Sequence, residues 1–209
     1  MRAHSTPAIF LLALPCVCSC VALPAPVAPQ YYGDYQVTAF IDIGQRSLDN
    51  SFDPVNDSSV LGVQVDIRQP NDSLGFERGF FHSSESKTEN VAGVGNVDFN
   101  SASSEFAIGG RWKLSSIIGD LRPVLGAGLS AISIDYSTDP VNGESNSASD
   151  WSVGPYVHGG FEYPLGDHFI LGIDYRRLFL TELINELDFD GVATDGNYSQ
   201  FTFSIGYAF

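Results

Sequence analysis

Apolar and polar residues alternate along most of the chain with a period of two, which is the pattern of β-strands whose two faces have different surroundings. The alternation predicts eight strands, over residues 34–44, 59–69, 75–83, 102–114, 121–136, 150–163, 168–179 and 199–209. The last strand is the most regular, and its apolar face holds Phe201, Phe203, Ile205, Tyr207 and Phe209. Eight such strands indicate an all-β fold.

Two of these strands are less regular. Arg78 falls on the apolar face of residues 75–83. In residues 121–136 the apolar positions change from the face of Leu129 to the face of Ile132. A β-bulge, which inserts one extra residue into a strand, would explain this change of face.

The connections between the strands alternate in length. Long, polar connections are expected near 45–58, 84–101, 137–149 and 180–198, and short ones near 70–74, 115–120 and 164–167. An up-and-down meander collects the long connections at one end and the short turns at the other. Closing the meander into a barrel removes its exposed edges. Such a barrel is either a soluble one with its apolar face inward or a membrane one with its apolar face outward.

The composition of the polar face favours a narrow barrel interior, where small residues lie beside large ones. Its glycines are Gly44, Gly62, Gly109, Gly126, Gly128, Gly154, Gly160, Gly172 and Gly206. Its ionic residues are the acids Asp42, Asp66, Glu77, Glu105, Glu162 and Asp174 and the bases Arg68, Arg111, Lys113, Arg122 and Arg176. Six acids and five bases can pair with one another, as buried charges require.

Aromatic residues gather at the strand ends on the apolar face, as they do in the interfacial girdles of membrane barrels. They are Tyr35, Trp112, Trp151, Tyr163, Tyr175 and Tyr207. Together with the polar face, they predict an eight-stranded antiparallel up-and-down transmembrane β-barrel. The alternative is a soluble barrel that binds a hydrophobic ligand.

The N-terminus reads as an export signal over residues 1–30, followed by one domain over residues 31–209. Arg2 supplies a positive charge ahead of the short apolar run 8–14, which is too short to span a bilayer. Cleavage near Ala22 or Ala28 is one possibility, and acylation of Cys20 is the other. All three cysteines lie in this segment, so the exported domain contains no disulfide.

The chain is acidic, with 10 Lys and Arg against 25 Asp and Glu and a formal net charge of -15 over 209 residues. This balance argues against nucleic acid as a partner, because binding phosphate backbones needs clustered bases. The acids concentrate in the long connections. Residues 45–59, 82–101, 136–150 and 179–198 contain 14 acids and 2 bases.

The final run from Phe201 to Phe209 resembles the C-terminal signature of bacterial outer-membrane proteins, an alternating strand that ends in Phe. With the signal segment and the eight strands, the whole chain resembles the small outer-membrane barrels typified by the OmpA membrane domain and OmpX. The resemblance implies a location in the bacterial outer membrane, among outer-membrane lipid and lipopolysaccharide. It also implies recognition by the barrel-assembly machinery through Phe209, short turns in the periplasm, and long connections outside the cell.

The leading functional hypothesis is a non-enzymatic outer-membrane protein with an envelope-structural or adhesin-like role, acting through acidic extracellular loops. These loops could bridge divalent cations to lipopolysaccharide or contact an extracellular partner. Asp188, Asp190 and Asp195 lack the spacing and the closing Glu of an EF-hand. We predict no metal site and no cofactor, and the filled interior of such a small barrel argues against general porin activity.

An outer-membrane lipid-modifying hydrolase is the alternative. His82 and Ser84 have the His-x-Ser spacing that resembles the outer-membrane lipid A deacylases, with Glu85 beside them. The residues around them do not match that family, and His158 is expected to be an interior hydrogen-bonding residue rather than a base. We therefore predict no catalytic residues.

Overall fold

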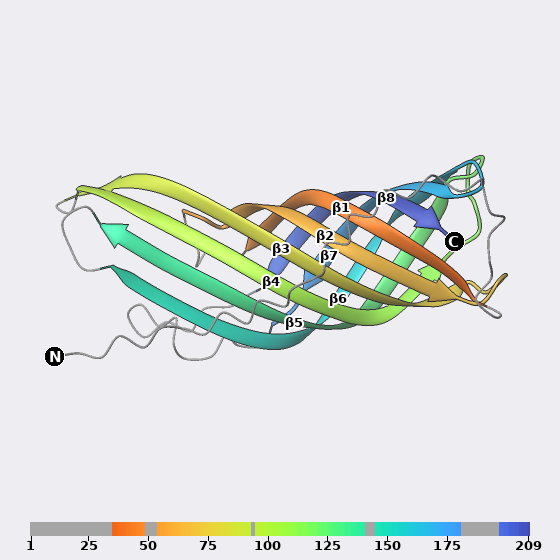
Figure 1. Ribbon diagram of the computed structural model, residues 1–209, viewed down its shortest axis with the longest axis horizontal. Coiled ribbons are helices and arrows are strands. Elements are labelled where there is room, and N and C mark those ends of the chain that lie inside the picture. Colours follow the sequence, from red (N-terminus) through yellow and green to blue (C-terminus); the bar gives the residue numbers. More distant parts are fainter. Residues whose placement is uncertain (1–34, 49–53, 93–94, 141–144, 181–196) are drawn as a thin grey trace, which may run out of the picture.

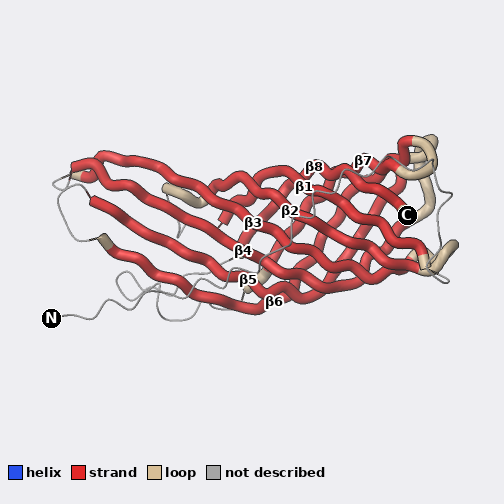
Figure 2. Tube along the Cα trace, in the orientation of Figure 1, coloured by secondary structure: helices blue, strands red, loops and turns tan. Residues whose placement is uncertain are grey.

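The eight strands form a closed barrel in the computed structural model, which describes residues 35–48, 54–92, 95–140, 145–180 and 197–209. Each strand pairs antiparallel with the next, and the last pairs with the first (Figures 1 and 2). The strands are β1 (Gln36–Leu48), β2 (Asp57–Arg68), β3 (Leu74–Val91), β4 (Gly95–Lys113), β5 (Arg122–Pro140), β6 (Asn146–Leu165), β7 (Phe169–Leu178) and β8 (Tyr198–Ala208). The predicted fold is confirmed. No helix within the described ranges is long and apolar enough to cross a bilayer.

The strand register is continuous, and the bulge that would explain the irregular alternation of 121–136 is absent from the described pairings. β5 pairs with β4 from Val124 to Pro140 without an inserted residue. Ile132 and Ile134 simply point into the barrel, where both are buried. The bulge interpretation is therefore wrong. The apolar residues change face because the barrel interior around Ile132 and Ile134 is itself apolar, and the backbone pairing continues unchanged.

Four strands are longer than predicted and continue beyond the barrel wall. β3 and β4 pair from Leu74 and Trp112 to Val91 and Gly95, so most of the expected loop 84–101 is a hairpin. Much of the expected loop 137–149 likewise belongs to β5 and β6. Figure 1 shows β3 to β6 projecting past the other four strands. We call residues 85–91, 95–101, 136–140 and 146–150 the outer sheet, and this end of the molecule the long-strand end.

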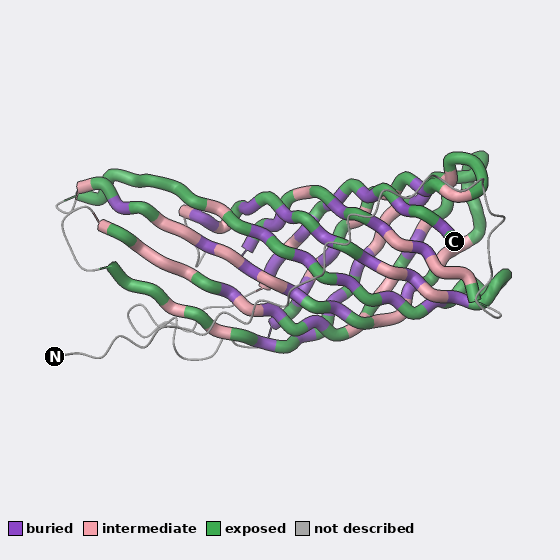
Figure 3. Tube along the Cα trace, in the orientation of Figure 1, coloured by how far each residue is buried: buried purple, intermediate pink, exposed green. Residues whose placement is uncertain are grey.

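The side chains on the outside of the barrel are apolar over a continuous band, which we call the outer belt. Buried and exposed positions alternate along the strands within the barrel wall (Figure 3). Belt residues from the eight strands include Ile41, Val63, Phe80, Ile108, Leu129, Val157, Ile173 and Phe203, all exposed. The six aromatic residues predicted for the girdles are exposed as well: Tyr35, Trp112, Trp151, Tyr163, Tyr175 and Tyr207. An apolar face that points outward contradicts the soluble-barrel alternative.

The belt has a sharp polar border toward the long-strand end. The next outward-facing positions on the eight strands are Gln45, Ser59, His82, Ser104, Ser133, Ser149, Arg177 and Ser199. Lipid-facing bands of outer-membrane barrels are about 25 Å tall. The belt therefore marks the part of the barrel that faces hydrocarbon. The outer sheet lies beyond the belt, outside the hydrocarbon layer.

Candidate functional site

The barrel lumen is filled by ionic side chains. The six acids predicted for the interior all point inward, and five of them are buried, with Asp174 partly buried. Four of the five predicted bases also lie inside, but Arg122 is exposed at the short-turn end. A fifth base inside the lumen is Arg46, which is buried. Arg46 was not predicted there because the first strand was expected to end at residue 44, whereas β1 continues to Leu48. The polar parity of that strand continues through Arg46 and could have revealed it.

The first ionic cluster surrounds Glu105 of β4, whose side chain is 0% exposed. Its Oε2 lies 2.5 Å from Nη2 of Arg46, and its Oε1 lies 3.2 Å from Nη1 of Arg176. The hydroxyls of Ser130 and Tyr198 also donate hydrogen bonds to Glu105. Because these residues come from β1, β4, β5, β7 and β8, one carboxylate ties five strands together.

Arg46 and Arg176 are held by further contacts. Arg46 donates to Ser103 Oγ at 2.8 Å and to Gln200 Oε1 at 2.7 Å, and its guanidinium lies 4.1 Å from the ring centre of Tyr198. The guanidinium of Arg176 lies 4.3 Å from the ring centre of Tyr156. Buried ion pairs need such additional partners, because the pair alone does not offset the loss of water.

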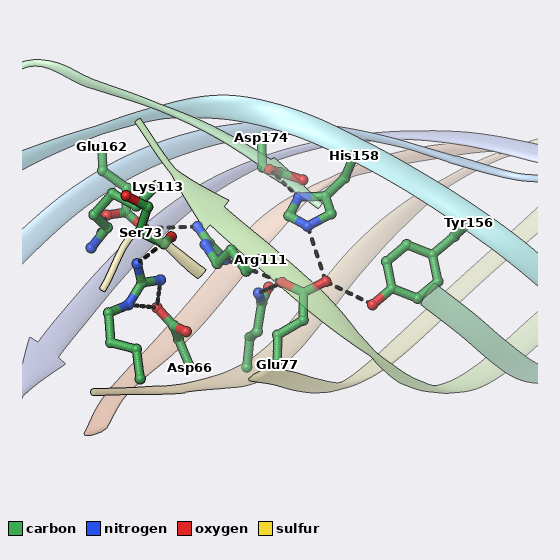
Figure 4. Close-up of polar contacts among 11 residues, drawn as sticks. Asp66, Ser73, Glu77, Arg111, Lys113, Tyr156, His158, Glu162 and Asp174 are labelled. Atoms are coloured by element: carbon green, nitrogen blue, oxygen red, sulfur yellow. Dashed lines mark hydrogen bonds and ion pairs between the residues drawn. The ribbon is translucent and has the colours of Figure 1, made fainter. Parts of the chain in front are cut away.

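The second cluster lies nearer the short-turn end and is drawn in Figure 4. Glu162 accepts from Arg111 at 2.8 Å and lies 2.7 Å from Nζ of Lys113. Glu77 accepts from Tyr156 at 2.6 Å and lies 3.8 Å from Nη1 of Arg111. Arg68 pairs separately with Asp66, two residues away on β2.

His158 bridges two acids within this second cluster, which confirms that it is an interior hydrogen-bonding residue. Its Nδ1 lies 2.7 Å from Asp174 Oδ2 and its Nε2 lies 3.0 Å from Glu77 Oε1 (Figure 4). Ionised carboxylates can only accept hydrogen bonds, so Nδ1 donates to Asp174, and the carboxylate oxygens near both ring nitrogens suit an imidazole that carries a positive charge. With His158 charged, the lumen holds six acids and six bases.

An apolar group packs around the first cluster inside the lumen, where Phe81 and Ile132 are the cross-strand neighbours of Glu105. It includes Leu48, Val60, Phe81, Ile132, Ile134 and Leu178, which are packed together and buried. The ionic clusters and this apolar group fill the described part of the barrel with side chains. Such an interior offers rigidity rather than an aqueous channel.

The hydrolase candidates do not come together as a triad. His82 and Ser84 point outward from β3, whereas Ser83 points inward and hydrogen-bonds Ser103. Glu85 also lies on the inward face. The nearest hydroxyl to His82 belongs to Ser104 of β4, with Nδ1 and Oγ 3.1 Å apart. In the described part of the chain no carboxylate contacts His82, so the group that would orient it as a base is lacking there.

The outer sheet encloses a polar hollow of about 790 Å³ on its concave side. One row of paired residues crosses its floor, from Glu85 through Ser101 and Tyr136 to Ala148. Serines and the acid Asp135 make up most of the remaining lining. A surface of hydroxyls and carboxylates can hydrogen-bond a polar partner.

Several sequence-based expectations fall outside the described residues. They concern the signal segment 1–30 with Cys20, and the acidic stretch with Asp188, Asp190 and Asp195. Among the residues that the structure does describe, no three potential metal ligands come together.

Comparison with known proteins agrees with the barrel architecture. No curated protein matches the chain in sequence. Neisserial surface protein A has 15% sequence identity over 84% of this chain and 97% of its own, with a TM-score of 0.52. Ail, the attachment invasion locus protein of Yersinia pestis, in complex with the heparin analogue sucrose octasulfate, has 15% identity over 84% and 97%, with a TM-score of 0.53. A major outer membrane protein from Thermus thermophilus has 11% identity over 83% and 99%, with a TM-score of 0.56. At these identities the likeness is one of fold.

The family is defined by a match that covers nearly the whole chain. The model described as "Outer membrane protein beta-barrel domain" matches residues 14–209, which include all eight strands. The outward belt and the filled lumen are the features that such a protein needs in lipid. The chain therefore belongs to the outer membrane protein beta-barrel domain family and is a protein of the bacterial outer membrane.

Proposed function

We propose that this protein is a non-enzymatic surface-interaction protein, in which the barrel is an anchor and the outer sheet with its acidic connections meets a partner outside the cell. For the outer sheet to meet such a partner, the long-strand end must face the outside of the cell and the short turns must face the periplasm. The observation that carries the proposal is the contrast between the two parts. The lumen is closed by buried ion pairs and apolar side chains, whereas the outer sheet extends past the belt with a polar, concave face.

Charge defines the kind of partner. The long connections and strand ends contain 14 acids and 2 bases over residues 45–59, 82–101, 136–150 and 179–198. One of the two bases, Arg46, points into the lumen and pairs with Glu105. The other, Lys87, lies 3.2 Å from Glu89. The surface is therefore strongly anionic and favours a basic protein, or divalent cations that bridge it to lipopolysaccharide.

The same charge makes sulfated sugars a poor match. Ail is similar to this chain in fold and is described in complex with a heparin analogue. A polyanion would be repelled by the outer sheet, where Glu89, Asp98 and Asp139 are all exposed. We therefore propose that the two proteins share an architecture but select partners of opposite charge.

The barrel-assembly machinery is the proposed partner during insertion. Phe209 is exposed on the belt side of the last strand, and its backbone N–H donates to Val37 O at 2.9 Å. The Phe209 side chain points away from the lumen, and this supports a role in recognition by the assembly machinery.

Adhesion of cells that display the protein tests the proposal. Cells with and without the protein would be applied to surfaces coated with a basic polypeptide or with heparin, with and without magnesium. We expect the protein to increase adhesion to the basic surface and not to heparin. The triple variant E89Q/D98N/D139N should lose most of this gain.

The matched control removes the same charge from the other end. D72N/D120N/D167N changes three exposed acids in the short turns and should leave adhesion unchanged. Equal loss in both variants, or stronger adhesion to heparin, would contradict the proposal. A mass change in lipid A that depends on the protein and is abolished by His82→Ala would instead favour the hydrolase.

A further inference from the structure

Arg78 is a charged residue in the middle of the outer belt. It points outward from β3 and is exposed. Its direct neighbours across the sheet are Val65 of β2 and Ile108 of β4, and Phe76 and Phe80 flank it on the same face of β3. At the belt positions within the described ranges, all other outward-facing side chains are uncharged. An arginine facing hydrocarbon is costly, and the cost is greatest at the middle of the bilayer.

The guanidinium of Arg78 leans toward the short-turn end. Its central carbon lies 5.5 Å from the ring centre of Phe76, which precedes it on the strand and is closer to the turn before β3. The side chain therefore lies along the wall in the direction of the membrane surface at the short-turn end. Long basic side chains in membranes take this course so that the charge reaches polar headgroups.

The barrel wall has an open position beside Phe76, the residue over whose ring the Arg78 guanidinium lies. Gly110 of β4 faces outward directly across from Phe76 and has no side chain to cover the ring. Only two atoms come within 4 Å of a Cβ placed there: Leu74 Cδ1 at 3.8 Å and the carbonyl oxygen of Gly75 at 3.9 Å. The space beside the Phe76 ring is thus free for an atom group from outside the protein.

We propose that Arg78, with the open position at Gly110, binds the phosphate of a phospholipid in the leaflet at the short-turn end. In the described part of the chain Arg78 has no carboxylate partner, so its counter-ion must come from elsewhere. A guanidinium can hold two phosphate oxygens side by side, and this charge-assisted geometry is among the stronger hydrogen-bonded contacts. The ring of Phe76 forms an apolar floor for the lipid next to it.

A second copy of the protein would not supply the missing charge. The outer belt of the described residues contains no acid, so two belts packed together would bring Arg78 only against apolar or basic side chains. Lipopolysaccharide also carries phosphates, but the guanidinium points away from the long-strand end. The site therefore takes phospholipid, and it rests on the belt and on the side-chain direction rather than on the surface-interaction function proposed above.

Unfolding in vesicles of two compositions tests the site. The full protein, purified from membranes, would be transferred into vesicles of phosphatidylcholine or of phosphatidylcholine with phosphatidylglycerol. Urea unfolding would be followed by the fluorescence of its two tryptophans. We expect phosphatidylglycerol to raise the folding equilibrium constant roughly fivefold, the effect of one basic residue at an anionic membrane surface. Native mass spectrometry should show one retained phosphatidylglycerol.

Three variants separate the site from general charge effects. R78Q should lose both the stabilisation by phosphatidylglycerol and the retained lipid. G110L keeps Arg78 but fills the open position, and it should also lose the retained lipid. R122Q removes the same charge from the exposed mouth of the barrel and should behave like the wild type. A persistent phosphatidylglycerol effect in R78Q, or an equal loss in R122Q, would overturn the proposal.

Discussion

Arg46 of β1 and Glu105 of β4 lie 59 residues apart in the sequence and form an ion pair of 2.5 Å in which neither side chain is exposed. Arg176 approaches the other oxygen of the same carboxylate from β7. One glutamate therefore pairs with two arginines, and all three side chains are almost fully buried. The stability of the barrel should depend strongly on this carboxylate.

Glu105→Gln should destabilise the barrel by about 3–5 kcal/mol, because it leaves two buried arginines without their charge partner. Arg46→Gln should cost less, since Glu105 keeps Arg176. The free energy of unfolding in vesicles, measured with urea, checks both. Glu89→Gln is the control: this exposed glutamate pairs with exposed Lys87, and its loss should change stability by less than about 1 kcal/mol. If E105Q were as mild as E89Q, the ion pair would not be a main support of the fold.

His158→Gln should destabilise the barrel by about 2–3 kcal/mol, since it removes the group that bridges Glu77 and Asp174 and leaves an excess of buried negative charge. Adding Asp174→Asn removes one of the two acids and should restore part of the loss. The same urea titration on the single and double variants measures the coupling. Simple addition of the two losses would contradict the charge balance inferred for the lumen.

Gly160→Ala should prevent folding, whereas Gly159→Ala should be tolerated. The two residues are adjacent on β6 but face opposite sides. A Cβ on Gly160 would collide with the backbone of β7 at Ile173 and lie 2.9 Å from Cα of Asp174. A Cβ on Gly159 would meet the flexible end of Leu125 at 3.1 Å. Closed membrane barrels usually stay folded in cold SDS, so gel mobility with and without boiling reports the folded fraction. Equal folded fractions would show that the wall at Gly160 can move.

Phe209→Ala should lower the amount of barrel inserted in living cells severalfold without lowering its yield of refolding into detergent. The expected loss arises from recognition by the assembly machinery, which purified refolding does not need. Phe203→Ala is the matched control, because it removes an exposed phenyl ring from the same strand and face. A similar loss of insertion in both variants would assign the effect to the apolar surface of the strand instead of its terminal residue.

Sequence alternation was sufficient for the fold because a two-sided environment leaves a period-two pattern in every strand. It correctly predicted the eight strands, the outward aromatic residues and the six inward acids. It underestimated β3 to β6, because residues such as Ser84, Ser101 and Ser137 leave the belt and meet polar surroundings on both faces, where alternation fades. β3, β4 and β5 continue beyond the belt because the backbone of each strand still pairs with its neighbour.

The sequence by itself determined the eight strands, since only the order of apolar and polar residues is needed for that. The glycines, balanced charges and end aromatics favoured a lipid-facing side, and the closed barrel showed that the apolar face points outward. Tertiary structure alone decided which charges meet. Arg46, Glu105 and Arg176 come from three distant strands, and their approach depends on how far each strand is shifted when the sheet closes. The same closure turned Ile132 and Ile134 into an interior layer. It also set Gly110 directly across from Phe76, the residue over whose ring the guanidinium of Arg78 lies.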